Sequence, residues 1–197
     1  ITDTAANLLA DAAATTTVMQ SDSVVTISDA ITATDALLIS AVATDADNVT
    51  LTSVSGDISD VIALGTNHIV FTNETTVEIT DNASVGQIET LANAGAVVTN
   101  ISYSLTGALG DFVENTTLAT FTVDADNATV VEAASSLNVT SASISDLTKL
   151  DAIVDVNVTA TTVSDTAVNI IADGGTYVVD GVNIVATDAS IAQIKTI

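Results

Sequence analysis

The chain has 197 residues, of which 25 are acidic and only two, Lys149 and Lys195, are basic, so its formal net charge is −23. Nucleic acids and anionic membrane surfaces are bound by clusters of basic side chains, so this composition excludes the first kind of partner and disfavours the second. Cysteine is absent, which excludes disulfide frameworks and thiolate metal sites, and no segment is long and apolar enough to span a bilayer.

Alternating β-branched residues recur along the chain and predict strands with one buried face. Clear examples are residues 49–54, 77–79, 101–105 and 156–159. Many of these runs close on a tripeptide: an aliphatic residue, then Thr or Ser, then Asp or Gly. Its third residue recurs about every 26 residues in the first half and about every 20 in the second, in strict or looser copies, at Asp3, Asp29, Gly56, Asp81, Gly107, Asp126, Asp146, Asp165 and Asp188.

After the tripeptide the spacing of apolar residues becomes helical. Apolar residues fall at i, i+3 and i+6 within residues 85–91, 147–153 and 191–197. Residues 3–11 and 165–173, which both contain this switch, match almost residue for residue. The closing Asp, or a nearby Ser such as Ser84 or Ser190, is therefore predicted to be the N-cap of a short helix.

Strand, cap, short helix and return together predict one coil of a β-solenoid, parallel β-helix-like, with leucine-rich-repeat-like α/β coils. Residues 1–197 are predicted to form a single continuous repeat domain of about eight coils, with a change of repeat length near residues 107–126. The repeats run to both ends of the sequence, so we expect a fragment of a longer repeat protein. A competing signal is Asp180-Gly181 within residues 177–184, which favours a hairpin.

Eight of the 13 asparagines stand in the pattern Asn-x-Ser/Thr, more than chance predicts, and are formal acceptors for N-glycosylation in a glycosylating host. A structural interpretation competes, because an Asn at each turn, before a Thr-alternating strand, generates the same pattern. Such asparagines would hydrogen-bond neighbouring turns. The eight are Asn48, Asn73, Asn82, Asn100, Asn115, Asn127, Asn138 and Asn157.

Two acidic loops share the sequence Asp-Ala-Asp-Asn, at residues 45–48 and 124–127. Alternating carboxylates offer the hard oxygen ligands that Ca²⁺ prefers, so Ca²⁺ is the one cofactor that the sequence suggests. Neither loop continues into a full calcium-loop motif, and an ordinary solvated turn is the alternative. The candidate ligands are Asp45, Asp47, Asn48, Asp124, Asp126 and Asn127.

Nothing in the sequence is typical of an enzyme. His68 is the sole histidine and lies beside apolar residues, where packing is its expected role. Asp111 and Glu114 are the carboxylate pair that could act on a glycoside, but chance pairs are common in so acidic a chain and no aromatic sugar platform accompanies them. Nucleophile and phosphate-binding motifs are absent from the sequence. We therefore expect a protein without enzymatic activity.

The paired units Ile/Val-Ser/Thr-Asp-Thr-Ala-x-Asn-Leu/Ile-Leu/Ile-Ala-Asp and Asp-x-Ala-Ser-Val/Ile-x-Gln-Ile carry a resemblance. They resemble the Thr/Ala/Val/Asp-rich repeats of large bacterial, notably cyanobacterial, cell-surface, S-layer or adhesin-like proteins. The resemblance covers most of the chain and breaks down between residues 108 and 140. It implies an extracellular or cell-surface protein that assembles with itself into a surface layer, filament or stalk.

Two other functions stay open. An adhesin or phage-fibre-type module would recognise glycans or a cell-surface polysaccharide. A polysaccharide-processing enzyme would use the carboxylates of Asp111 or Glu114.

Overall fold

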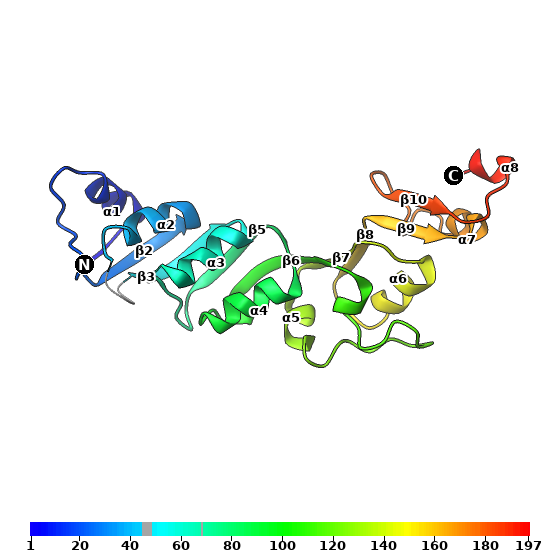
Figure 1. Cartoon of the computed structure of the whole chain (residues 1–197), viewed down its shortest axis with the longest axis horizontal. Coiled ribbons are helices and arrows are strands. Elements are labelled where there is room, and N and C mark those ends of the chain that lie inside the picture. The colour runs from blue at the N-terminus through cyan, green and yellow to red at the C-terminus, as the bar shows by residue number, and fades with distance from the viewer. Residues whose placement is uncertain (45–48, 68) are drawn as a thin grey trace. The chain divides into compact units, whose positions relative to one another are not determined.

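A computed structural model describes residues 1–44, 49–67 and 69–197 (Figure 1). The chain forms two compact units, Ile1–Tyr103 and Ser104–Ile197, and passes from one to the other within the strand β6 (Ile101–Gly107). In both units parallel strands alternate with short helices. Among the described residues, no helix combines the length and apolar character needed to cross a membrane.

The strands of the first unit pair in parallel in chain order. Val25, Val49 and Ile69 lie opposite one another on three neighbouring strands, so buried positions line up across the sheet. A one-residue bulge shifts the register between Ile27 and Ala30. The order is β1 (Thr2–Asp3), β2 (Val25–Thr32) and β3 (Val49–Gly56), after which both β4 (Ile69–Val70) and β5 (Thr76–Ala83) pair with β3.

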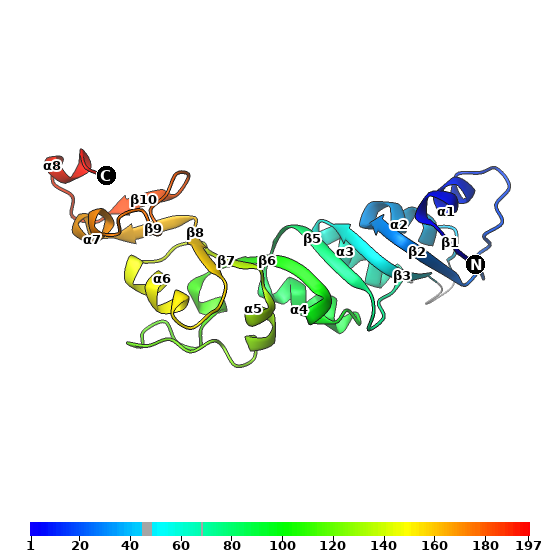
Figure 2. The same cartoon turned by 180° about the vertical axis from the view of Figure 1, so that it is seen from behind.

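The helices of the first unit cover one face of these strands and leave the other face open (Figures 1 and 2). Each helix packs on the next one along the chain. Val85, Ile88 and Leu91 are buried in α4, which confirms the helical stripe predicted there. The helices are α1 (Ala5–Ala12), α2 (Ala33–Ser40), α3 (Ile58–Thr66), α4 (Val85–Asn93) and the 3-10 turn η1 (Val98–Asn100).

The second unit repeats this scheme less regularly. Its parallel strands are the end of β6, β7 (Ser136–Val139) and β8 (Asn157–Ala160), followed by a separate parallel pair of β9 (Thr162–Asp165) and β10 (Asn183–Ala186). Leu137, Leu147 and Leu150 are fully buried in its core. The helices are η2 (Leu109–Asp111), α5 (Ala128–Ala133), α6 (Ile144–Asp151), α7 (Ala167–Ala172) and α8 (Ile191–Ile194).

The predicted fold class, a parallel β-helix-like solenoid with short helices in leucine-rich-repeat-like α/β coils, is wrong. The chain has a mixed α/β fold in which α-helices pack on a parallel sheet. A β-helix needs further strands to form its other walls. Here the segments after the strands have helical apolar spacing and a capping Ser or Thr, so helices occupy that place instead.

The predicted hairpin at residues 177–184 is also wrong. The N–H of Val182 donates to the carbonyl of Val179 at 3.2 Å, and Gly181 adopts a φ of 90°, so the turn itself forms. The residues after the turn enter β10, which pairs in parallel with β9 rather than antiparallel with the residues before the turn. Pairing with the preceding repeat therefore prevails over the local turn signal.

Candidate functional site

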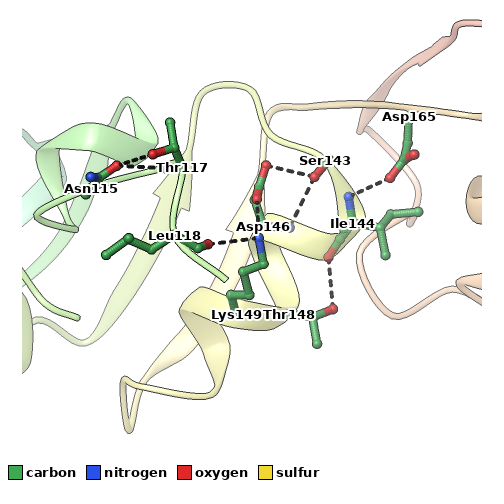
Figure 3. Close-up of polar contacts among 9 residues, drawn as sticks. All are labelled: Asn115, Thr117, Leu118, Ser143, Ile144, Asp146, Thr148, Lys149 and Asp165. Atoms are coloured by element: carbon green, nitrogen blue, oxygen red, sulfur yellow. Dashed lines mark hydrogen bonds and ion pairs between the residues drawn. The ribbon is translucent and has the colours of Figure 1, made fainter. Parts of the chain in front are cut away.

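At four of its copies, the third residue of the tripeptide links consecutive repeats. Asp165, at the end of β9, accepts a hydrogen bond through Oδ2 from the backbone N–H of Ile144, the first residue of α6, at 3.0 Å (Figure 3). The first N–H groups of a helix have no partner within the helix, and a carboxylate is favoured there by the helix dipole. Each such bond therefore fastens one repeat's helix to the next repeat's strand.

The same bond recurs at three other joints. Its donor is always the first residue of a helix, and its acceptor is the carboxylate of the following tripeptide, 21 to 24 residues further along. Asp29 accepts from Ala5 at 2.6 Å, Asp81 from Ile58 at 2.8 Å and Asp188 from Ala167 at 2.9 Å.

The prediction that the closing Asp caps its own helix is therefore wrong. Strands β1 and β9 each end on their closing Asp. The N-cap is therefore the next residue, Thr4 for α1 and Thr166 for α7. Ser84 and Ser190 are confirmed as N-caps, each in a capping box with a Gln three residues later. The side chains that accept a capping bond from their own helix are Thr4, Thr32, Ser84, Ser143, Thr166 and Ser190.

Glycine replaces the aspartate at two joints for reasons of space. A Cβ on Gly56 would lie 2.9 Å from the Cβ of Ala33, the first residue of α2. A Cβ on Gly107 would lie 2.6 Å from a carboxylate oxygen of Asp111, which instead accepts from the N–H of Ala108 at 2.8 Å. Glycine thus marks two close-packed joints. The aspartate copies are not all alike, because Asp126 lies in a turn and Asp146 lies within α6 rather than at a strand end.

The two matching segments use their first aspartate identically. Oδ1 of Asp3 accepts from the next residue's N–H at 2.8 Å and from the side-chain amide of Asn7 at 2.7 Å. Oδ1 of Asp165 accepts the equivalent bonds at 2.7 Å and, from Asn169, at 2.8 Å. Oδ1 thus serves the aspartate's own repeat in both segments, which leaves Oδ2 for a neighbour.

The role of the second aspartate of each segment, Asp11 or Asp173, does not follow from the sequence pattern. Asp11 accepts from two successive backbone N–H groups at residues 18–19, and Asp173 does the same at residues 177–178, with bonds of 2.8 to 3.1 Å. Each carboxylate fixes the loop that leaves its helix. The match between the two segments was the available signal, but loops of different length follow them and hide the shared partner.

Hydrogen bonds change the acidity of these groups. Asn7, with a further bond from the N–H of Thr4, lowers the pKa of Asp3. Burial alone would raise the pKa of Asp165, but hydrogen bonds from Asn169 and from two backbone N–H groups outweigh it and leave that pKa below its usual value. Both carboxylates therefore stay ionised to lower pH than an ordinary aspartate.

No protein-family model, curated protein or solved structure matches the chain.

The open face of the first unit carries two grooves of about 460 Å³ each, whose linings mix polar and apolar residues. Thr50, Thr52, Thr72 and Glu74 are among the residues that line one of them. The other contains Thr76, Thr99, Ser102 and Glu78. Hydroxyl and carboxylate oxygens can hydrogen-bond the hydroxyls of a sugar.

Only the second of the two predicted calcium loops lies among the described residues. Asp45, Asp47 and Asn48 lie outside the described residues. In the second loop, Oδ1 of Asp124 accepts from the N–H of Asp126 at 3.0 Å, and its backbone carbonyl accepts from the N–H of Asn127 at 3.1 Å. Within residues 1–44, 49–67 and 69–197, no three acidic, His or Cys side chains come together as a metal ion would require. Calcium binding stays a prediction.

The asparagines of the glycosylation pattern differ in their surroundings. Asn100 donates through Nδ2 to the backbone carbonyl of Asn73 at 2.8 Å, across 27 residues of sequence, which is the inter-repeat bond that the structural interpretation predicts. Asn138 accepts from the Thr161 hydroxyl at 3.3 Å, and Asn127 donates to the carbonyl of Asp111 at 3.4 Å. The exposed side chains are Asn73, Asn82, Asn115 and Asn157, while Asn48 is outside the described residues. Glycosylation stays a prediction.

The remaining sequence candidates have local contacts. The carboxylate of Asp111 bonds the N–H of Ala108, and Glu114 accepts from the Thr122 hydroxyl at 3.2 Å. His68 lies outside the described residues. In the second unit, the ammonium group of Lys149 donates to Asp146 at 3.2 Å and lies 4.9 Å from the centre of the Phe121 ring.

Thr75 is a buried polar residue that the sequence did not reveal. Its hydroxyl donates to the carbonyl of Leu51 at 2.8 Å and accepts from the N–H of Thr72 at 2.9 Å. These bonds provide hydrogen-bond partners for backbone groups between β4 and β5, where the backbone pairing along β3 is interrupted.

Proposed function

We propose that the chain is an extracellular structural repeat protein that assembles with itself into a surface layer, filament or stalk. The recurring bond from a helix N–H to the next repeat's aspartate carries this proposal. The acidic residues with the most regular contacts thus hold repeats together. A joint made of backbone pairing and one carboxylate can be repeated between copies as well as within one.

The acidic charge fits a saline setting outside the cell. Copies with a net charge of −23 repel one another unless salt screens them. At physiological ionic strength the screening length is about 8 Å, so short-range contacts between copies then become effective. Divalent cations such as Ca²⁺ would reduce the repulsion further.

Light scattering of the purified chain tests this function. The average mass should rise with protein concentration in physiological salt, and rise further with added Ca²⁺. A monomeric mass at every concentration, with and without Ca²⁺, would contradict self-assembly.

A glycan-binding module is the second candidate, and the two hydroxyl-lined grooves favour it. Under this alternative the open face would bind a cell-surface polysaccharide. Binding on a glycan array that Thr52→Val and Glu78→Gln weaken, by a protein that remains monomeric, would support it in place of self-assembly.

A further inference from the structure

Asn115 lies near the start of an exposed loop in the second unit. The loop spans residues 114–120, and every residue in it is exposed. An antiparallel bridge between Val113 and Val123 closes the loop at its base, and Phe121 beside this bridge is buried. The loop therefore presents Asn115 to solvent from an anchored base.

The carboxamide of Asn115 is held by the third residue of its own Asn-x-Thr pattern. The N–H of Thr117 donates to Oδ1 of Asn115 at 2.9 Å, and the Thr117 hydroxyl donates to the same oxygen at 2.7 Å (Figure 3). Because a backbone N–H can only donate, the atom that faces it is the carboxamide oxygen. Nδ2 is then the atom left over, and it has no hydrogen-bond partner among the described residues.

This arrangement suits the transfer of a sugar to Nδ2. An amide nitrogen is a weak nucleophile, because its lone pair is delocalised into the carbonyl group. The two donors on Oδ1 of Asn115 stabilise the negative charge that the carboxamide gains when Nδ2 loses a proton. They therefore make this nitrogen easier to activate than the nitrogen of a carboxamide without such bonds.

Three of the other described Asn-x-Ser/Thr patterns use the hydroxyl of their third residue to hold the fold. These patterns begin at Asn73, Asn82 and Asn157. The hydroxyls of Thr75, Ser84 and Thr159 donate to Leu51, Gln87 and Leu137, at 2.8, 3.1 and 3.3 Å respectively. None of these three hydroxyls bonds the asparagine of its own pattern among the described contacts.

The other three described patterns use the asparagine itself. Nδ2 of Asn100 and Nδ2 of Asn127 each donate to a backbone carbonyl. Asn138 lies within β7, where its Oδ1 accepts from the hydroxyl of Thr161 rather than from its own third residue. Within the part of the chain that the structure describes, Asn115 is thus the one asparagine of the pattern whose own Thr bonds its carboxamide oxygen.

We propose that Asn115 is an N-glycosylation site of the folded chain and receives its glycan from a lipid-linked oligosaccharide. An oligosaccharyltransferase joins Nδ2 of Asn115 to C1 of the first sugar. The bond from C1 to the pyrophosphate oxygen breaks, its electron pair leaves with the lipid pyrophosphate, and Nδ2 gives up one proton to a base of the transferase. The inference rests on the extracellular location in the proposed function and not on self-assembly.

Glycosylation of the folded chain in vitro tests this site. The purified full chain is incubated with an oligosaccharyltransferase and a lipid-linked oligosaccharide, and the products are mapped by mass spectrometry. Asn115 should be modified at least tenfold faster than any of the other six described asparagines of the pattern. Asn115→Gln should abolish this modification, whereas Asn157→Gln, the same change at another exposed acceptor, should leave it intact.

Peptides from a chymotryptic digest of the same chain are the control for geometry, because they keep the patterns and lose the fold. Several of these peptides should be modified at rates similar to that of the Asn115 peptide. Modification of the Asn115 peptide but not of Asn115 in the folded chain would overturn the proposal, as would an equal rate at a second described asparagine of the folded chain. Light scattering reports on self-assembly separately: a monomeric chain modified at Asn115 would keep this inference and contradict self-assembly.

Discussion

The carboxylate of Asp165 binds the backbone N–H of Ile144, 21 residues earlier, at 3.0 Å, while its other oxygen binds the next N–H and Asn169 in its own repeat. One side chain therefore satisfies donors in two consecutive repeats. The bond joins a helix start to a strand end, two places where backbone groups would otherwise lack partners.

Asp165→Ala should lower the free energy of unfolding by about 0.5–2 kcal/mol, the usual effect of losing a helix-capping side chain. Urea unfolding measures this loss. Asp180→Ala is the matched control, because it removes the same charge from an exposed turn for which no side-chain bond is seen among the described residues. Equal destabilisation by both substitutions would mean that net charge, not the joint, is responsible.

Gly56→Ala should destabilise the first unit by about 1–3 kcal/mol, because the new Cβ would lie 2.9 Å from the Cβ of Ala33 and force the strand and helix apart. Gly86→Ala is the control. It adds the same methyl group in α4, where nothing lies within 4 Å, and should stabilise by up to about 1 kcal/mol through helix propensity. Thermal unfolding of the two variants should move in opposite directions, and a shift of the same sign would argue against close packing at Gly56.

Thr75→Val keeps the shape of the side chain and removes its hydroxyl, so the carbonyl of Leu51 and the N–H of Thr72 lose a buried partner. We expect a loss of about 1–3 kcal/mol in the free energy of unfolding. Thr76→Val, the same change at the next, exposed position, should alter it by less than about 0.5 kcal/mol. Equivalent unfolding curves for the two variants would show that the Thr75 hydroxyl does not contribute to the free energy of unfolding.

Acidification should weaken the Asp165 joint. The pKa of Asp165 is lowered in the folded protein, so its stabilisation is present above the unfolded value of about 3.9 and is lost as pH falls through the folded value. Lower pH also relieves general charge repulsion, so the informative quantity is the difference in unfolding free energy between wild type and Asp165→Asn. That difference should shrink between pH 6 and pH 2.5. A constant difference would show that the folded pKa of Asp165 is not shifted.

Local patterns in the sequence predicted the local structure well. Periodicity predicted the buried face of α4 at residues 85–91, and capping chemistry predicted the N-caps Ser84 and Ser190. Both features depend only on neighbours three or four residues away. Alternation likewise predicted β3, whose bounds extend two residues beyond the run.

Features that depend on the next repeat could not be predicted in this way. The sequence shows that Asp29, Asp81 and Asp165 recur. Their partner is the first residue of a helix more than 20 residues away, and no spacing within one repeat reveals it. The wrong fold class has the same cause. Local spacing predicts both the strands and the short helices, but it does not show whether they close into the coil of a solenoid or pack as helices on an open sheet. The bonds of Thr75 depend on a break in pairing that only the fold creates.

Electron microscopy of the purified chain in physiological salt, imaged over a range of concentrations, tests self-assembly most directly. The proposed function predicts extended assemblies that grow with concentration and dissolve at low salt, where the negative charge is unscreened. Isolated particles of one size at every concentration and salt would contradict it.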